Sequence, residues 1–82
     1  MCLAIPMQIA AIDGHVARCT AKGVVREVNL LLLEEVPAVN DHVLVHAGHA
    51  VQTLTEQEAA ATWLLLDEIL ALEAAAARRG VG

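Results

Sequence analysis

Six side chains in this sequence could ligate a metal ion or act as nucleophiles, two of them thiols and four imidazoles. They are Cys2, Cys19, His15, His42, His46 and His49. Thiolate is the reactive form of cysteine and a soft ligand, which suits low-valent iron. Imidazole ligates metals when it is neutral, above a pKa of about 6.5. These residue types therefore permit metal binding or thiol chemistry.

Cys2 follows Met1 directly. Because cysteine is small, we expect cytoplasmic processing to remove the methionine and leave a free α-amine beside the thiol. That amine has an ordinary pKa of about 8, and a neighbouring ammonium favours the thiolate. A thiol on the first residue can also enter a site on another protein. From composition alone, however, the simpler interpretation is a chance terminal cysteine.

Cys19 lies in a stretch of alternating residues, on the same side as Ala17. Its position predicts a small buried hydrophobic residue. A redox pair between Cys2 and Cys19 is a less favoured alternative, since it would join a terminus to a buried strand. His15 lies beside a turn signal and is expected to be exposed.

The other three histidines are close together in the sequence. His42 and His46 fall on one face of a strand, because side chains alternate between the two faces. With His49 nearby, adventitious nickel or zinc binding is a minor alternative. A histidine at the end of a strand is otherwise more often a structural hydrogen-bonding residue than a ligand.

Short apolar stretches separated by turn signals predict a small β-barrel. We expect strands over 7–12, 15–20, 24–32, 42–47 and 50–54 and a loop over 34–41. Asp13-Gly14 is a strong hairpin signal, and the stretch 21–23 predicts a second turn. These strands would form the barrel from residues 1–54.

Helical periodicity replaces the strand pattern from Thr55 onward. The sequence Thr55-Glu-Gln-Glu58 fits a capping box, in which the first and last residues cap each other's amides. Ala59, Trp63, Leu66 and Leu70 follow at helical spacing and predict a stripe that packs on the barrel. We expect a helix over 55–79 and a frayed tail over 80–82, with one domain in all.

Composition excludes two classes of partner. The chain has 82 residues, a formal net charge of −5 and a single aromatic residue, Trp63. Nucleic acids are bound mainly through Lys and Arg, so a nucleic-acid-binding role is not expected. The apolar run 63–66 is broken by Asp67 and Glu68, so no membrane span is expected. With no secretory signal, we expect the cytoplasm and free thiols.

Two blocks of the sequence are similar to those of a known family. The first is Met-Cys-Leu-Ala-Ile-Pro at 1–6, and the second is the stretch 41–50, Asp-His-Val-Leu-Val-His-Ala-Gly-His-Ala. They resemble the N-terminal signature and a second block of the HypC/HupF family of [NiFe]-hydrogenase maturation chaperones. The hairpin at 13–14 and the helix start at 56–59 stand where the family has them. The family usually has an aromatic residue at the position of His49 and frequently one at His42.

The resemblance implies an OB-fold-like barrel with a C-terminal helix, and no catalytic activity. It implies a carrier of an iron fragment, Fe(CN)2CO, from a HypD-type scaffold protein to the precursor of the hydrogenase large subunit. Cys2 and His46 are the implied iron-binding residues. The implied partner-binding segment is Cys2, Leu3, Ala4, Ile5 and Pro6.

Two other classes of function remain alternatives at this point. One is a small thiol enzyme or redox module with Cys2 as nucleophile and His46 as base. No acidic residue to orient the histidine and no Gly-rich loop can be identified for it. The other is a generic OB-like binding domain, which the acidic charge and lack of aromatic residues do not favour as a nucleic-acid binder.

Overall fold

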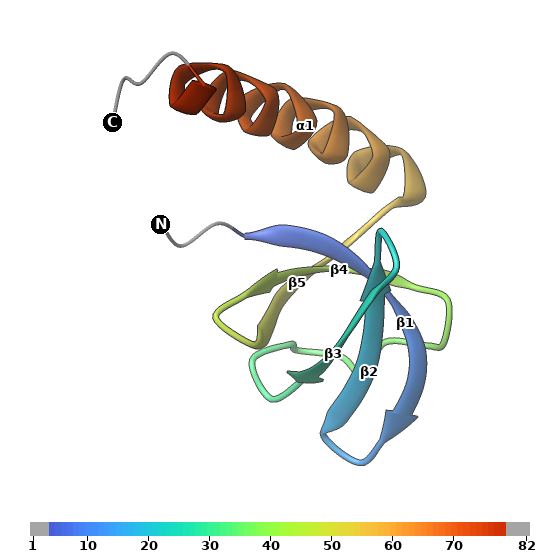
Figure 1. The fold of residues 1–82 in the computed structure, drawn as a ribbon. Helices are drawn as coiled ribbons and strands as arrows, with labels where there is room; N and C mark the ends of the chain where they lie inside the picture. The colour runs from blue at the N-terminus through green and yellow to red at the C-terminus, as the bar shows by residue number, and fades with distance from the viewer. Residues whose placement is uncertain (1–3, 79–82) are drawn as a thin grey trace.

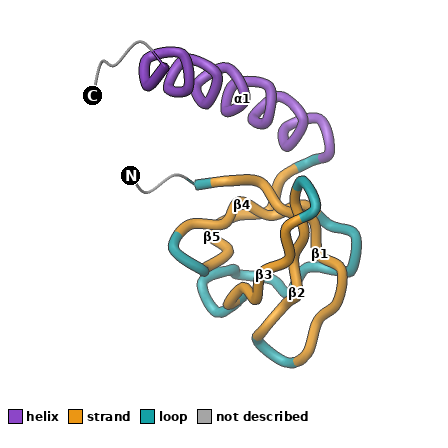
Figure 2. The backbone as a smooth tube through the Cα atoms, viewed as in Figure 1, coloured by secondary structure: helices purple, strands orange, loops and turns teal. Residues whose placement is uncertain are grey.

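Five strands and one helix make up residues 4–78, the part of the chain that the computed structural model describes (Figure 1). They are β1 (Ile5–Asp13), β2 (Val16–Ala21), β3 (Val24–Asn29), β4 (His42–His46), β5 (His49–Leu54) and α1 (Glu56–Arg78). The strands close into a barrel in the order β1-β2-β3-β5-β4. Figure 2 shows the helix lying outside this barrel. The predicted fold class, a small OB-fold-like β-barrel with a C-terminal helix, is confirmed.

Tight turns fix the register of the first two hairpins. Gly14 has a φ of 63°, and Lys22 and Gly23 have φ values of 49° and 79°. Short hairpin loops whose twist matches the strands need positive φ, which glycine adopts most readily. Asp13 ends β1 instead of forming the turn, which Gly14 and His15 make. His15 is exposed, as predicted.

The barrel core is built from small and aliphatic side chains that alternate with exposed ones along the strands. It comprises Met7, Ile9, Ala17, Cys19, Val28, Leu30, Val43, Val45 and Ala50. Cys19 is completely buried, as predicted from its place beside Ala17. Val16, on the opposite face of β2, is 41% exposed.

β3 is shorter than the sequence pattern predicts. The expected strand over 24–32 ends at Asn29. The Asn29 side-chain oxygen accepts a hydrogen bond of 2.8 Å from the Leu31 amide, which turns the chain out of the sheet. Leu30 is still anchored, because its amide donates to the His15 carbonyl at 2.8 Å. The apolar run after Asn29 therefore becomes loop, and Leu32 is 61% exposed.

A capping box starts α1 as predicted. The Glu58 amide donates to the Thr55 hydroxyl at 3.0 Å, and the Thr55 amide donates to Glu58 Oε1 at 2.9 Å. Ala59 and Leu66 are buried, so the predicted stripe packs on the barrel through the first half of the helix. The prediction is wrong for Leu70, which is 48% exposed. The reason is geometric: 23 residues of helix are about 34 Å long, longer than the barrel face.

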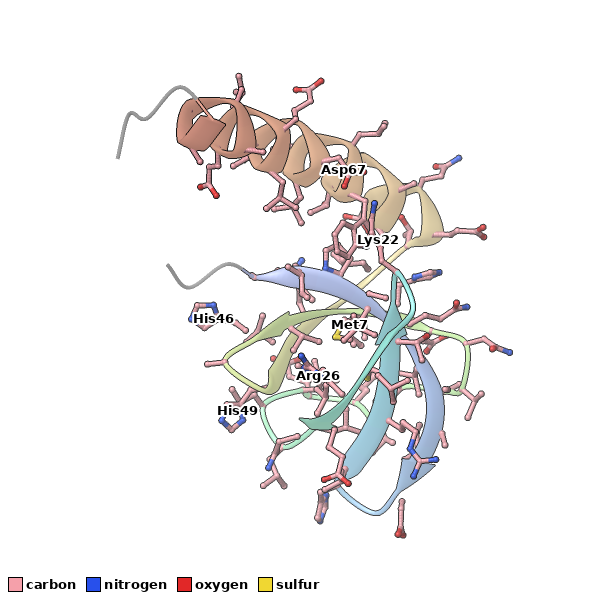
Figure 3. The ribbon with its side chains drawn as sticks, viewed as in Figure 1. Met7, Lys22, Arg26, His46, His49 and Asp67 are labelled. Atoms are coloured by element: carbon pink, nitrogen blue, oxygen red, sulfur yellow. The ribbon has the colours of Figure 1, made fainter. Side chains whose placement is uncertain are left out.

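Contacts of Trp63 and Asp67 with β1 and with the turn between β2 and β3 hold α1 against the barrel. Trp63 Nε1 donates to the Pro6 carbonyl at 3.1 Å. The Lys22 ammonium lies 5.0 Å from the centre of the Trp63 ring and 2.8 Å from a carboxylate oxygen of Asp67 (Figure 3). The helix extends beyond these contacts, giving a molecule of 46 × 22 × 22 Å. Within residues 4–78, no helix is long and apolar enough to cross a membrane.

Candidate functional site

The N-terminal segment enters the barrel as the first part of β1. Ala4 and Ile5 are half-buried, and Pro6 is fully buried. The Pro6 carbonyl is the acceptor for the Trp63 indole, so this segment is fixed from the helix side as well. Cys2 and Leu3, both predicted site residues, lie outside the described residues. Ala4 and Ile5 therefore form the described surface of the predicted partner-binding segment.

Sheet register brings the start of β1 and the end of β4 together. In the antiparallel pair of β1 and β4, Ile5 lies opposite Val45. His46 is the next residue after Val45, ends β4 and is exposed. His42 and His46 point away from the core because Val43 and Val45 occupy the inner face, as alternation predicts. The two sequence blocks that carry the resemblance thus meet at one end of the barrel.

A tight hairpin sets His46 beside His49. The two residues pair across the turn formed by Ala47 and Gly48, whose φ values are 52° and 81°. Two positive φ values are the mark of a type I′ hairpin turn, which holds the flanking residues directly opposite each other. The left-handed conformation costs alanine about 1–2 kcal/mol. Figure 3 shows His46 and His49 at the same end of the barrel.

A shallow hollow of about 210 Å³ lies next to this hairpin. Its lining includes Ile5, Val45 and Gly48 from the site just described, and the oppositely charged neighbours Arg26 and Glu27 from β3. Sequence reasoning did not place Arg26 here, because only the barrel closure brings β3 next to the start of β1. The guanidinium is a multiple hydrogen-bond donor, and imidazole is a metal ligand. This end of the barrel therefore offers both kinds of group.

The remaining thiol and histidines do not join this site. Cys19 is inside the core, and burial raises the pKa of its thiol, which keeps it protonated. His15 lies at the far end of β1 from Ile5. Among residues 4–78, no group of three or more His, Cys, Asp or Glu side chains could hold a metal ion. The described part of the chain thus gives no support to the alternative of a histidine patch for nickel or zinc.

The sequence matches the HupF/HypC family over residues 1–66. It is 36% identical over 78 residues to the hydrogenase maturation factor HypC of Escherichia coli strain K12, covering 89% of this chain and 87% of that protein. It is 38% identical over 71 residues to HypC of Helicobacter hepaticus, covering 85% and 83%.

Similarity to a HupF protein is stronger over a shorter stretch. The chain is 46% identical over 59 residues to the hydrogenase expression/formation protein HupF of Bradyrhizobium diazoefficiens. That match covers 72% of this chain and 59% of the relative, so it spans about three fifths of the longer protein. The match with the family includes both residue blocks that meet at the β1–β4 end of the barrel.

Proposed function

The chain belongs to the HupF/HypC family, whose relatives are named hydrogenase maturation factors, and on that premise we propose that it is a non-catalytic carrier in [NiFe]-hydrogenase assembly. Its cargo is an iron carrying two cyanides and one carbon monoxide. It takes this Fe(CN)2CO fragment from a HypD-type scaffold protein and delivers it to the large-subunit precursor in the cytoplasm. The observation that carries the proposal is the family match over 1–66.

Cys2 is the proposed point of contact with the iron or with a cysteine of the partner. A thiolate is the soft ligand that suits low-valent iron, and an adjacent α-ammonium favours the thiolate form. Cys19 is an unsuitable replacement, because its thiol is buried and its pKa is raised. Of the two cysteines, the proposal therefore assigns iron binding to Cys2.

His46 is proposed as the second iron-binding residue. Ile5 pairs with Val45, so the strand that leads to Cys2 starts beside the strand that ends in His46. The pairing of Ile5 with Val45 brings the two blocks that carry the resemblance together, which supports a shared role for Cys2 and His46.

Arg26 can contribute to holding the same cargo. It lines the hollow beside Ile5 and Val45. Cyanide nitrogens accept hydrogen bonds, and the guanidinium presents several N–H donors in a planar fork. The proposal thus combines a soft thiolate, an imidazole and a donor for the cyanide ligands at one end of the barrel.

Replacing Cys2 by alanine tests the proposed function. The variant is expressed in a strain that lacks the native protein, and hydrogenase activity and large-subunit processing are measured. We expect unprocessed precursor to accumulate and activity to be lost. The free energy of unfolding should change by less than about 0.5 kcal/mol, since Cys2 precedes the first strand. Normal hydrogenase activity with Cys2→Ala would show that the assignment is wrong.

A further inference from the structure

One edge of β5 is open although the barrel is closed. β5 pairs with β4 from His49 to Leu54. With its other neighbour, β3, it pairs only where Asn29 lies opposite His49. Among residues 4–78, no further backbone hydrogen bond joins 51–54 to a segment other than β4. A row of backbone donors and acceptors is therefore free on this side.

A groove of about 740 Å³ runs along this open edge. One wall is β5 together with Thr55, and the other is the loop that follows β3. The exposed apolar side chains Leu32, Val36 and Val51 line it and are 61%, 74% and 40% exposed. Exposed aliphatic side chains next to unpaired backbone groups are the features that an added strand would cover.

The titratable residues that line this groove are all acidic. Asp41 accepts a hydrogen bond from the Ala38 amide, and Glu58 caps the helix. Glu34 and Glu35 have no such role, are exposed, and make no ion pair within the described part of the chain. Their negative charge is thus available to a basic partner, and it repels phosphate.

β5 also lacks most of the features by which proteins usually protect an open edge. Its sequence, His-Ala-Val-Gln-Thr-Leu, contains no Lys, Pro, Asp or Glu. Edge strands are normally protected from pairing by charged residues, proline, bulges or a covering segment. β5 has one of these features, a bulge at Val51, because Val45 pairs with Ala50 and Leu44 pairs with Gln52. Gln52–Leu54 remain in regular register. This edge is accordingly suited to pairing.

We propose that this groove, the β5 groove, binds an extended segment of a partner protein that adds to β5 as a further strand. In such a segment aliphatic side chains alternate with Lys or Arg. The aliphatic side chains would cover Leu32, Val36 and Val51, and the basic ones would lie near Glu34 and Glu35. Backbone pairing supplies affinity in this mode and the alternate side chains supply specificity. The proposal concerns a different face from the β1–β4 end and does not depend on iron carriage.

Synthetic peptides test the mode of binding. The first is a capped heptapeptide of alternating Lys and Val, the second has Glu in place of Lys, and the third is the basic peptide with every second amide N-methylated. Amide chemical shifts of the full chain are followed during titration with each peptide. We expect the basic peptide to shift amides of 51–55 and 32–36. The acidic and N-methylated peptides should bind about tenfold more weakly, through charge repulsion and lost hydrogen bonds respectively.

Charge-reversal variants locate the site. Glu34→Lys with Glu35→Lys should weaken binding of the basic peptide about tenfold, while Glu68→Lys with Glu73→Lys, on the exposed surface of α1, should change it less than about twofold. Melting temperatures of both double variants confirm that they fold. If the N-methylated peptide bound as tightly as the unmethylated basic peptide, charge attraction alone would explain the binding and the proposal would be overturned. Shifts confined to other faces, or none at about 1 mM peptide, would also overturn it.

Discussion

Burial decides which of the two cysteines can do chemistry. Cys19 has no exposed surface and packs in the barrel core. Burial raises the pKa of its thiol, so at neutral pH this sulfur is a protonated apolar side chain. A Cys2–Cys19 redox pair would need Cys19 to leave the core. Any metal binding or redox chemistry of a thiol in this protein is therefore assigned to Cys2.

Cys19→Ser tests this structural role. The substitution places a hydroxyl among apolar side chains and should lower the free energy of unfolding by about 1–3 kcal/mol if the hydroxyl finds no partner. Urea denaturation measures the loss, and Cys19→Ala provides an apolar control. Hydrogenase maturation should decline only as far as stability does. A loss of maturation at unchanged stability would contradict the structural role and revive the redox pair.

Substitutions of His46 and His49 test whether His46 has a specific role in iron binding that the adjacent His49 does not share. His46→Ala should lower the iron content of the purified protein and the processing of the large subunit. His49→Phe should be tolerated, because the family usually has an aromatic residue there. Both side chains are exposed, so each variant should keep its unfolding free energy within about 0.5 kcal/mol. Equal damage from both variants would contradict a specific role of His46.

At the scale of elements, short-range signals identified much of the structure. Three predicted features depend only on residues close in sequence. They are the capping box at Thr55, the hairpins, and the alternation of buried and exposed residues in β2 and β4. The early end of β3 has a local cause as well, the Asn29 side chain, but an apolar run conceals it. The end of the packed stripe at Leu66 depends on barrel width, which no local pattern encodes.

The capping box makes helix stability depend on pH. Hydrogen bonds from the Thr55 backbone amide and from its hydroxyl lower the pKa of Glu58 below its ordinary value of 4.5. A lowered pKa means that the carboxylate stabilises the fold above the pKa of the unfolded chain. This contribution disappears as pH falls through the lower pKa of the folded protein. The helix should therefore lose stability in acid, below about pH 4.5.

Melting temperatures followed between about pH 6 and about pH 3 measure this effect. The difference in stability between the wild type and Glu58→Gln should shrink as pH falls, because the glutamine does not titrate. Thr55→Ala removes the hydroxyl that accepts from the Glu58 amide, keeps the backbone amide that donates to Glu58, and should cost about 1 kcal/mol near neutral pH. A constant difference between wild type and Glu58→Gln across this range would contradict the cap's role.

At the scale of the whole molecule, pairing between strands that are distant in the sequence creates features that local sequence patterns do not predict. The family resemblance of two sequence blocks identified Cys2 and His46 as candidates, but only the pairing of β1 with β4 shows that the described parts of the two blocks lie side by side. Arg26 reaches the same hollow only because β3 closes the barrel. The open edge of β5 likewise results from a single parallel pair, Asn29 with His49. These features depend on contacts between distant segments, which periodicity and turn signals do not specify.

Infrared spectroscopy tests most directly whether this protein carries an iron fragment through Cys2. The wild type and Cys2→Ala are purified from hydrogenase-producing cells without oxygen, and the region of metal-bound carbon monoxide and cyanide stretching is recorded. We predict both sets of bands, with iron, in the wild type and their loss in Cys2→Ala at unchanged melting temperature. Wild-type protein without these bands, or bands that persist in Cys2→Ala, would contradict the account.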